Sequence, residues 1–180
     1  MGMVLLATGD LEAARTHLQE ALALSQTLND RWALLNNFRL LGQVALAQHN
    51  EADARTFFEE SLALCKEIGE FRMMALVLLS IGDMRYAHDE RQAAAQHFRE
   101  ALHAAHQAHV VAVQLDSLAR LAEIFHLDGQ HQRAMELCRL ILEHPAASAE
   151  AKQRTASLYE QLRAIAPTVC LLYTSDAADE

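Results

Sequence analysis

Residues 38–61 read FRLLGQVALAQHNEADARTFFEES, and residues 78–101 read LLSIGDMRYAHDERQAAAQHFREA. In the first stretch Gly42 follows two leucines, and Phe58 comes later in the same stretch. The second stretch has the same two residue types at the same places, as Gly82 and Phe98. An offset of about 40 residues that recurs along a chain marks an internal repeat, and the repeat unit decides the architecture.

The repeat places small or apolar residues in columns. One group of columns is Ala14, Ala54, Ala94 and Ala134; Leu18, Phe58, Phe98 and Cys138; and Ala21, Ser61, Ala101 and Ile141. The upstream group is Gly2, Gly42, Gly82 and Ala122; Leu41, Ile81 and Leu121; and Phe38, Leu78 and Leu118. Steps of three and four residues put each group on one face of a helix. The pattern therefore predicts two helices in each repeat: a first helix that carries the upstream columns and a second helix that carries the other columns. A polar break such as His49-Asn50 separates them.

These columns predict an all-helical chain. Second helices are expected near 11–28, 51–67, 91–107 and 131–143, and first helices near 31–48, 71–88, 111–127 and 147–164. Strong helix formers dominate the composition, and 6 Gly and 2 Pro are too few to punctuate a sheet protein. A helical hairpin cannot bury its apolar face alone, so successive hairpins must stack.

Composition and charge exclude several classes of function. The formal net charge of -9 argues against direct binding of nucleic acid, since phosphate contacts need a basic surface. The longest apolar run, residues 73–79, is far shorter than a bilayer span, and the first residues lack the features of a signal peptide. The cysteines Cys65, Cys138 and Cys170 are isolated, which predicts no disulfide framework. We therefore expect a cytoplasmic protein with no membrane partner.

The columns resemble the tetratricopeptide repeat (TPR) family, whose pattern has an aromatic residue, Leu-Gly and Tyr in the first helix and Ala, Phe and Ala in the second. The matching residues are Phe38, Leu41, Gly42, Ala54, Phe58 and Ser61 in one copy, and Ile81, Gly82, Ala94, Phe98 and Ala101 in the next. The following copy departs, with Ala122 for Gly and Cys138 for Phe. The resemblance covers about residues 1–165 and implies an all-α fold, a right-handed α-α superhelix built as a TPR-like solenoid of stacked helical hairpins. An unrelated helical bundle, which has periodicity without a fixed repeat, is the alternative.

The period of about 40 residues is longer than the period of about 34 that is common in this family. In this respect the array resembles the MalT-like transcription activators and other large bacterial signal-transduction NTPases. There the array lies C-terminal to the nucleotide-binding domain and serves as a sensor or partner-binding arm. The resemblance implies a protein–protein interaction or scaffold module, in signal transduction and transcription regulation, that binds a protein, a peptide or other domains of its parent protein. A free-standing TPR adaptor and an enzyme with a helical-repeat active site are the alternatives.

Neither end of the sequence fits the pattern of a complete helical hairpin. Gly2 falls in the mid-helix column of Gly42, so the array of residues 1–165 is expected to be truncated at its N-terminus inside a helix. Residues 166–180 are expected to form a disordered tail. Residues 170–180, CLLYTSDAADE, can be encoded by a transposon-end sequencing adapter, so we expect them to be translated adapter, excluded from the natural fold.

The sequence supplies no catalytic constellation. His103, His106 and His109 are spaced by three residues, whereas zinc-binding helices pair their ligands at i and i+4. There is no phosphate-binding loop and no G-x-S-x-G motif. Cys138 lies in a packed column, which favours a core role over reactivity. We therefore expect no enzyme, no metal site and no cofactor.

The resemblance instead implies a binding groove, because first helices line the concave face in the TPR family. The positions carried over to this sequence are Asn36, Arg39, Gln43, Asp83, Tyr86, Asp116, Arg120, Glu123 and His126. This mixed polar set suits a peptide or a partner helix, although ordinary solvated positions would have the same composition. Leu76 and Leu79, on the same lining, are either an apolar anchor for the partner or packing under a neighbouring helix.

Overall fold

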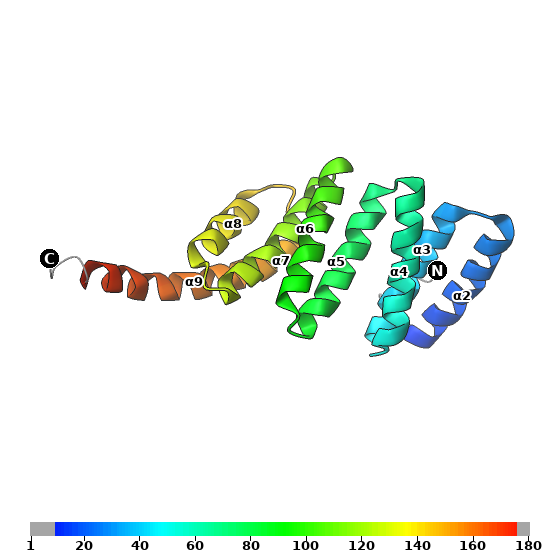
Figure 1. Cartoon of the computed structure of the whole chain (residues 1–180), viewed down its shortest axis with the longest axis horizontal. Coiled ribbons are helices and arrows are strands. Elements are labelled where there is room, and N and C mark those ends of the chain that lie inside the picture. The colour runs from blue at the N-terminus through cyan, green and yellow to red at the C-terminus, as the bar shows by residue number, and fades with distance from the viewer. Residues whose placement is uncertain (1–9, 176–180) are drawn as a thin grey trace. The chain divides into compact units, whose positions relative to one another are not determined.

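The computed structural model describes residues 10–175, with side chains up to residue 165, and this part of the chain contains helices and no strand (Figure 1). The second helices are α2 (Leu11–Leu28), α4 (Glu51–Ile68), α6 (Arg91–Gln107) and α8 (His131–Glu143). The first helices are α3 (Arg31–Ala47), α5 (Phe71–Ala87), α7 (Val111–Leu127) and α9 (Ala149–Ser175). The all-helical prediction is confirmed, and the ends of α2 to α8 lie within a residue of the predicted ones.

The end of α9 is the exception. The sequence predicts a helix that ends near residue 164 and a disordered tail from 166, whereas the backbone is helical through Ser175. Leu171 and Leu172 favour a helix, but Pro167, Thr168 and Val169 do not, so the composition of residues 166–175 does not explain the extension. Residues 1–9, with Gly2, and residues 176–180 lie outside the described part. The adapter origin of 170–180 concerns the gene and stays a prediction.

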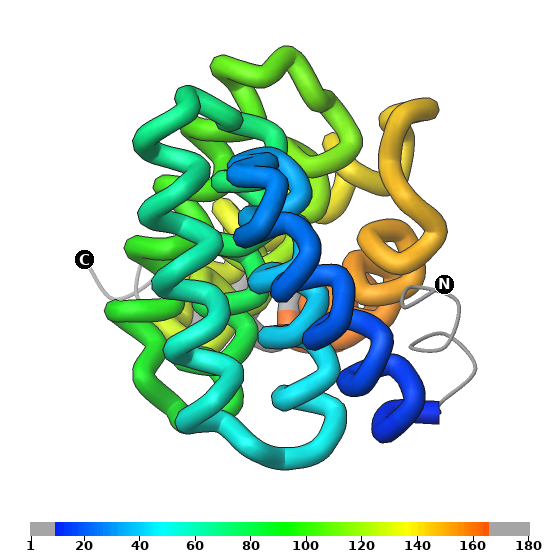
Figure 2. The backbone as a smooth tube through the Cα atoms, turned by 90° about the vertical axis from the view of Figure 1, so that its right-hand side faces the viewer, coloured from blue at the N-terminus to red at the C-terminus, as the bar shows by residue number. Residues whose placement is uncertain are grey.

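The chain divides into two compact units, residues 1–109 and residues 110–180. The first unit contains α2 to α6, with the hairpins α3–α4 and α5–α6. The second contains α7, α8 and α9, with the hairpin α7–α8. Figure 2 follows the backbone through the tight turns between the helices.

The turns recur with the same period as the helices. A residue with positive φ lies just after the end of α2, α4 and α6, at Asn29, Gly69 and His109, and another follows α3, α5 and α7, at His49, Asp89 and Gly129. Only two of these six are glycine, so four turns hold a side chain in the left-handed region that glycine adopts most easily. Side chains cap the early helices: Asp10, Asp30 and Asn50 accept hydrogen bonds from backbone N–H groups three residues ahead.

In the first unit the predicted columns form the core. The column alanines Ala14, Ala54 and Ala94 are fully buried, and so is Phe58, while Phe98 is 1% exposed. Phe58 packs in one cluster with residues of its own hairpin and with Val77 and Met84 of the next. The large residue of the second helix α4 therefore joins one hairpin to the next, as the sequence predicts.

Each phenylalanine also packs against the glycine of its own hairpin. A Cβ added to Gly42 would lie 2.6 Å from Cε1 of Phe58, and one added to Gly82 would lie 2.6 Å from Cδ1 of Phe98. Real carbon atoms do not approach so closely, so the phenylalanine requires the glycine.

The second unit has a larger residue at the glycine position and a smaller residue at the phenylalanine position. Ala122 replaces the glycine and Cys138 replaces the phenylalanine, and both are fully buried in one cluster with Leu158 and Leu162 of α9. The Cβ of Ala122 fits because the smaller cysteine side chain leaves it room.

This pairing predicts a strongly non-additive mutant cycle. Gly82→Ala alone is expected to lower the free energy of unfolding by about 1–3 kcal/mol, because the ring of Phe98 must move. Phe98→Cys alone is expected to cost about 3–5 kcal/mol through the cavity it leaves. In the Phe98→Cys background, Gly82→Ala should be neutral or stabilising by up to about 1 kcal/mol, since alanine favours a helix. Urea unfolding followed by circular dichroism measures all four chains, and additive effects would refute the contact.

Candidate functional site

In the first unit the first helices lie side by side. Helix α3 contacts α5 through its backbone, whereas no Cα atoms of the second helices α2, α4 and α6 lie within 8 Å of one another in the described part of the chain. Helices α2 and α4 meet instead through side chains, since Nη2 of Arg15 donates to Oδ2 of Asp53 at 3.0 Å. The backbones of the first helices α3 and α5 therefore lie closer together than those of the second helices. Five predicted groove residues are on α3 and α5, and all five are half-buried: Asn36, Arg39, Gln43, Asp83 and Tyr86.

Three of them form a cluster on α3. Arg39 donates from Nη1 to Oε1 of Gln43 and from Nη2 to Oδ1 of Asn36, both at 3.2 Å. The spacings of three and four residues place these side chains on one helix face. The buried Nε of Arg39 has no hydrogen-bond partner. Burial, and to a smaller extent the charge of Arg72, lowers the pKa of Arg39. The cluster therefore holds a half-buried cation in place on this face, which suits an acidic group on a partner.

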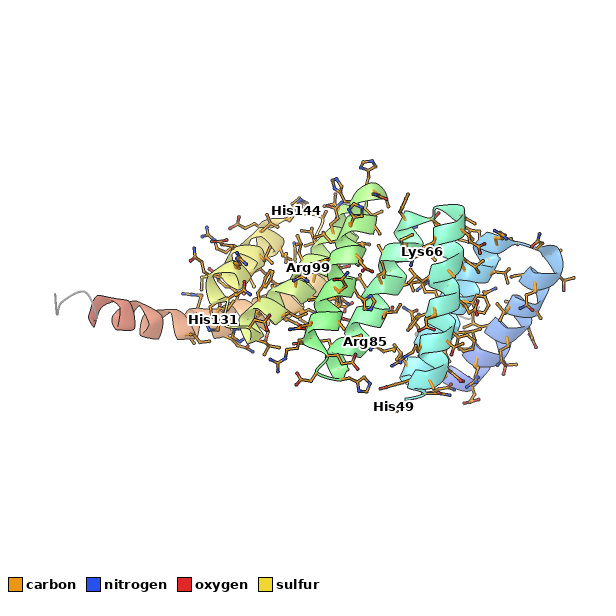
Figure 3. All side chains as sticks on the ribbon, in the orientation of Figure 1. His49, Lys66, Arg85, Arg99, His131 and His144 are labelled. Carbon is orange, nitrogen blue, oxygen red and sulfur yellow. The ribbon has the colours of Figure 1, made fainter. Side chains whose placement is uncertain are left out.

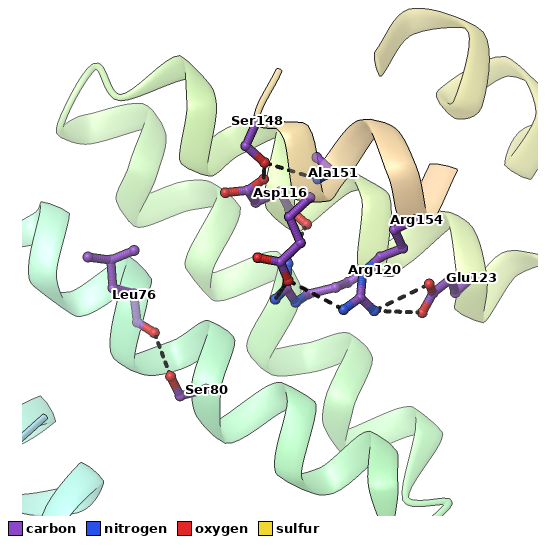
Figure 4. A network of polar contacts seen from close by, with 9 residues as sticks. Leu76, Ser80, Asp116, Arg120, Glu123, Ser148, Ala151 and Arg154 are labelled. Atoms are coloured by element: carbon purple, nitrogen blue, oxygen red, sulfur yellow. Dashed lines mark hydrogen bonds and ion pairs between the residues drawn. The ribbon is translucent and has the colours of Figure 1, made fainter. Parts of the chain in front are cut away.

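In the second unit the predicted residues Asp116, Arg120, Glu123 and His126 all lie on α7 and are half-buried. Figure 4 shows how the first of them meets the start of α9. The Ser148 hydroxyl donates to Oδ1 of Asp116 at 2.7 Å and accepts from the backbone N–H of Ala151 at 3.0 Å. Arg120 donates to the backbone carbonyl of Asp116 at 3.2 Å. Asp116 thus helps to fix the first turn of α9 against α7.

The next two residues are also engaged inside the unit. Arg154 of α9 donates from Nη1 to both carboxylate oxygens of Glu123, at 3.3 and 3.2 Å. The ring nitrogens Nδ1 of His126 and His131 are 3.2 Å apart. The structure therefore brings the four residues of α7 to one face, but much of their hydrogen-bonding capacity is used within the unit. No local sequence pattern indicates this, because the partners lie on other helices.

The two leucines left open by the sequence pack inside the first unit. Leu79 is 6% exposed, and Leu76 packs against the buried cluster of Leu35, Cys65 and Met73. Packing under neighbouring helices is therefore the reading that the structure favours for both.

The sequence analysis missed a pocket of about 480 Å³ in the first unit. Its walls include Lys66 of α4, Phe71, Met74 and Leu78 of α5, and Arg99 and Ala104 of α6. Figure 3 labels the two basic residues. Because the lining comes from three helices, only their stacking assembles it.

The histidines and cysteines of residues 10–165 form no metal site and no activated thiol. No three His, Cys, Asp or Glu side chains of this part could together hold a metal ion. His103 bonds Gln107, and the rings of His106 and His109 are 6.5 Å apart. Cys65 and Cys138 are buried, and burial raises the pKa of each thiol to about 11. A thiol that holds its proton so firmly is a poor nucleophile.

The raised thiol pKa values predict a pH dependence of stability. Unfolded thiols lose their protons near pH 9.0, whereas the folded ones keep them to about pH 11. The folded state then binds more protons in this window, so the free energy of unfolding should fall as pH rises from about 9 to about 11. In a Cys170→Ser background, urea unfolding should show a steeper fall than in the same chain with Cys65→Ala and Cys138→Ala. Equal slopes would contradict the burial of the thiols.

The contacts of Arg154 predict a local effect on α9. Arg154→Ala should weaken the docking of this helix by about 0.5–1.5 kcal/mol, as for the loss of one hydrogen-bonded pair, and speed amide exchange in residues 149–165. Arg163→Ala is the matched control, because its pair with Glu160 is exposed on the same helix. Unchanged exchange in Arg154→Ala, or equal acceleration in both variants, would contradict this role.

A search for membrane-spanning segments finds no described helix with the length and apolarity to cross a bilayer. The family model named tetratricopeptide repeat matches residues 1–67. A crystal structure of BtubC (BKLC) from P. vanneervenii is similar over 99% of this chain and 79% of that one, with 16% identity and a TM-score of 0.71. A putative kinesin light chain from Podosopora anserina, with nearly identical TPR-like repeats, is similar over 93% of this chain and 92% of that one, with 19% identity and a TM-score of 0.64.

A comparison with curated proteins gives no match. At these identities the structural likeness concerns the fold, and it extends well beyond the residues that the family model covers. The fold is that of a TPR-like solenoid of helical hairpins, with the tetratricopeptide sequence pattern detected in residues 1–67.

Proposed function

We propose that this chain is a protein-binding module whose first helices hold a peptide or a partner helix. The observation that supports it best is the adjacency of α3 and α5, which gives the first unit a continuous face of half-buried polar side chains. On this face the half-buried Arg39 is positioned by hydrogen bonds to Gln43 and Asn36. Side chains that are held in place before binding lose little entropy when a partner arrives.

The proposed contacts in the first unit are Asn36, Arg39, Gln43, Asp83 and Tyr86. We expect an acidic group of the partner near Arg39, since the neighbouring Arg72 adds positive charge there. Asp116, Arg120, Glu123 and His126 provide the corresponding surface of the second unit, where α9 already uses part of their bonding capacity.

The wider context follows from the resemblance of the repeats. We propose that the module is the sensor or partner-binding arm of a larger cytoplasmic bacterial regulator, with a role in signal transduction and transcription regulation. A free-standing adaptor is the second candidate, and the likeness to kinesin light chain repeats is compatible with it. An enzyme with a helical-repeat active site is a weaker third. The full-length gene separates them: an upstream nucleotide-binding loop supports the regulator, and further repeats alone support the adaptor.

Peptide selection tests the binding face. Peptides selected from a random display library on the folded chain should be acidic, and Arg39→Gln should weaken their binding by about tenfold or more, the effect of losing a hydrogen bond to a charged group. Arg55→Gln is the matched control, because Arg55 is exposed on the second helix α4. Fluorescence anisotropy with labelled peptides measures both. Peptides that bind both variants equally, or that depend on Arg55, would contradict the proposed face.

A further inference from the structure

We propose that the pocket between α4, α5 and α6 is a second binding site, for a small amphipathic anion such as a carboxylate with an aliphatic or aromatic body. This site is separate from the protein-binding face, because it opens between second helices rather than along first helices. Nothing in the proposed protein-binding function requires it.

The opening follows from the stacking of the hairpins. No Cα atom of α4 lies within 8 Å of a Cα atom of α6 in the described part of the chain, while each of the two helices packs on α5. Because α4 and α6 are separated, a groove lies between them, and α5 forms its floor. The floor consists of Met74 and Leu78 of α5, and Leu78 is only 3% exposed.

Four of the nine residues that line the pocket are apolar, and most of its exposed lining surface is hydrocarbon. The apolar part of the lining consists of Phe71, Met74 and the nearly buried Leu78 and Ala104, and residue Phe71 is 39% exposed although it is large and aromatic. A volume of about 480 Å³ lies within the usual range of roughly 300–1,000 Å³ for sites that hold small ligands. Burial of an apolar ligand body against Phe71 would remove hydrocarbon surface from water on both sides.

Two basic side chains of the lining have no ion-pair partner among the described residues. Lys66 and Arg99 both line the pocket, and neither forms an ion pair or a side-chain hydrogen bond with any residue that the structure describes. The one carboxylate on the rim, Glu100, accepts a hydrogen bond from Gln96 at 2.7 Å and lies 3.8 Å from Nδ1 of His97. Two uncommitted cations beside an apolar floor, in a chain of net charge -9, favour a ligand with an anionic head and an apolar body.

Isothermal titration with dodecanoate, below its micelle concentration, tests the site. One dodecanoate should bind per chain with saturation, and dodecyltrimethylammonium, which has the same tail and a positive head, should bind at least about tenfold more weakly. Equal binding of the two, or no saturable binding of dodecanoate, would overturn the proposal. An unchanged circular dichroism spectrum at saturation shows that the signal comes from the folded chain, and a loss of helix would overturn it.

Paired variants locate the binding. The double variant Lys66→Gln, Arg99→Gln should weaken dodecanoate binding by about tenfold or more, whereas Lys152→Gln, Arg139→Gln, with the same change of charge in the second unit, should leave it unchanged. Phe71→Ser should also weaken it, whereas Trp32→Ser, at another exposed aromatic residue, should not. Equal effects within either pair would overturn the assignment.

The protein-binding proposal and the small-anion proposal can be refuted independently of each other. Arg39→Gln should leave dodecanoate binding intact, and the Lys66, Arg99 double variant should leave binding of the selected peptides intact. If dodecanoate is inert and the selected acidic peptides instead depend on Lys66 and Arg99, the pocket belongs to a protein partner and the small-anion proposal is wrong.

Discussion

The contact between a phenylalanine ring and a glycine of the facing helix is the constraint on which each hairpin of the first unit depends. Phe58 occupies the space that a side chain at position 42 would need, and Phe98 does the same at position 82. The ring of Phe58 also reaches the next hairpin, so one side chain sets both the spacing within a hairpin and the stacking of its neighbour. The second unit satisfies the same geometry with Ala122 and Cys138, which shows that the pair, and not either residue alone, is what the fold requires.

The two candidate surfaces follow from the same stacking. The backbones of α3 and α5 approach each other more closely than those of the second helices, so α3 and α5 share a polar lining, while α4 and α6 leave a pocket between them over α5. The polar lining includes Arg39 and its partners Asn36 and Gln43. The pocket over α5 has an apolar floor with Lys66 and Arg99 beside it. A single architecture thus offers both the surface proposed for a peptide and the pocket proposed for a small ligand.

Polar residues on equivalent first-helix positions have different environments. Arg39 bonds neighbours on its own helix, so its spacing to Asn36 and Gln43 is sufficient to predict the cluster. Glu123 and Asp116 instead bond Arg154 and Ser148, which lie more than a helix away in sequence. Local periodicity identifies which face such residues occupy, but it does not identify which partner reaches them across the interface, because that depends on how the helices pack.

The sequence by itself determined the helices, most of their ends and the core columns, because the repeat period and the steps of three and four within it are properties of the chain alone. It also placed the predicted groove residues on first helices. Only the tertiary structure decided that α7 and α9 share an ion pair at Glu123, that Leu76 and Leu79 are packed, and that Lys66, Phe71 and Arg99 line one pocket. Those facts depend on distances between helices, and the distances are fixed by the volumes of buried side chains such as Phe58 and Phe98, which no local pattern measures.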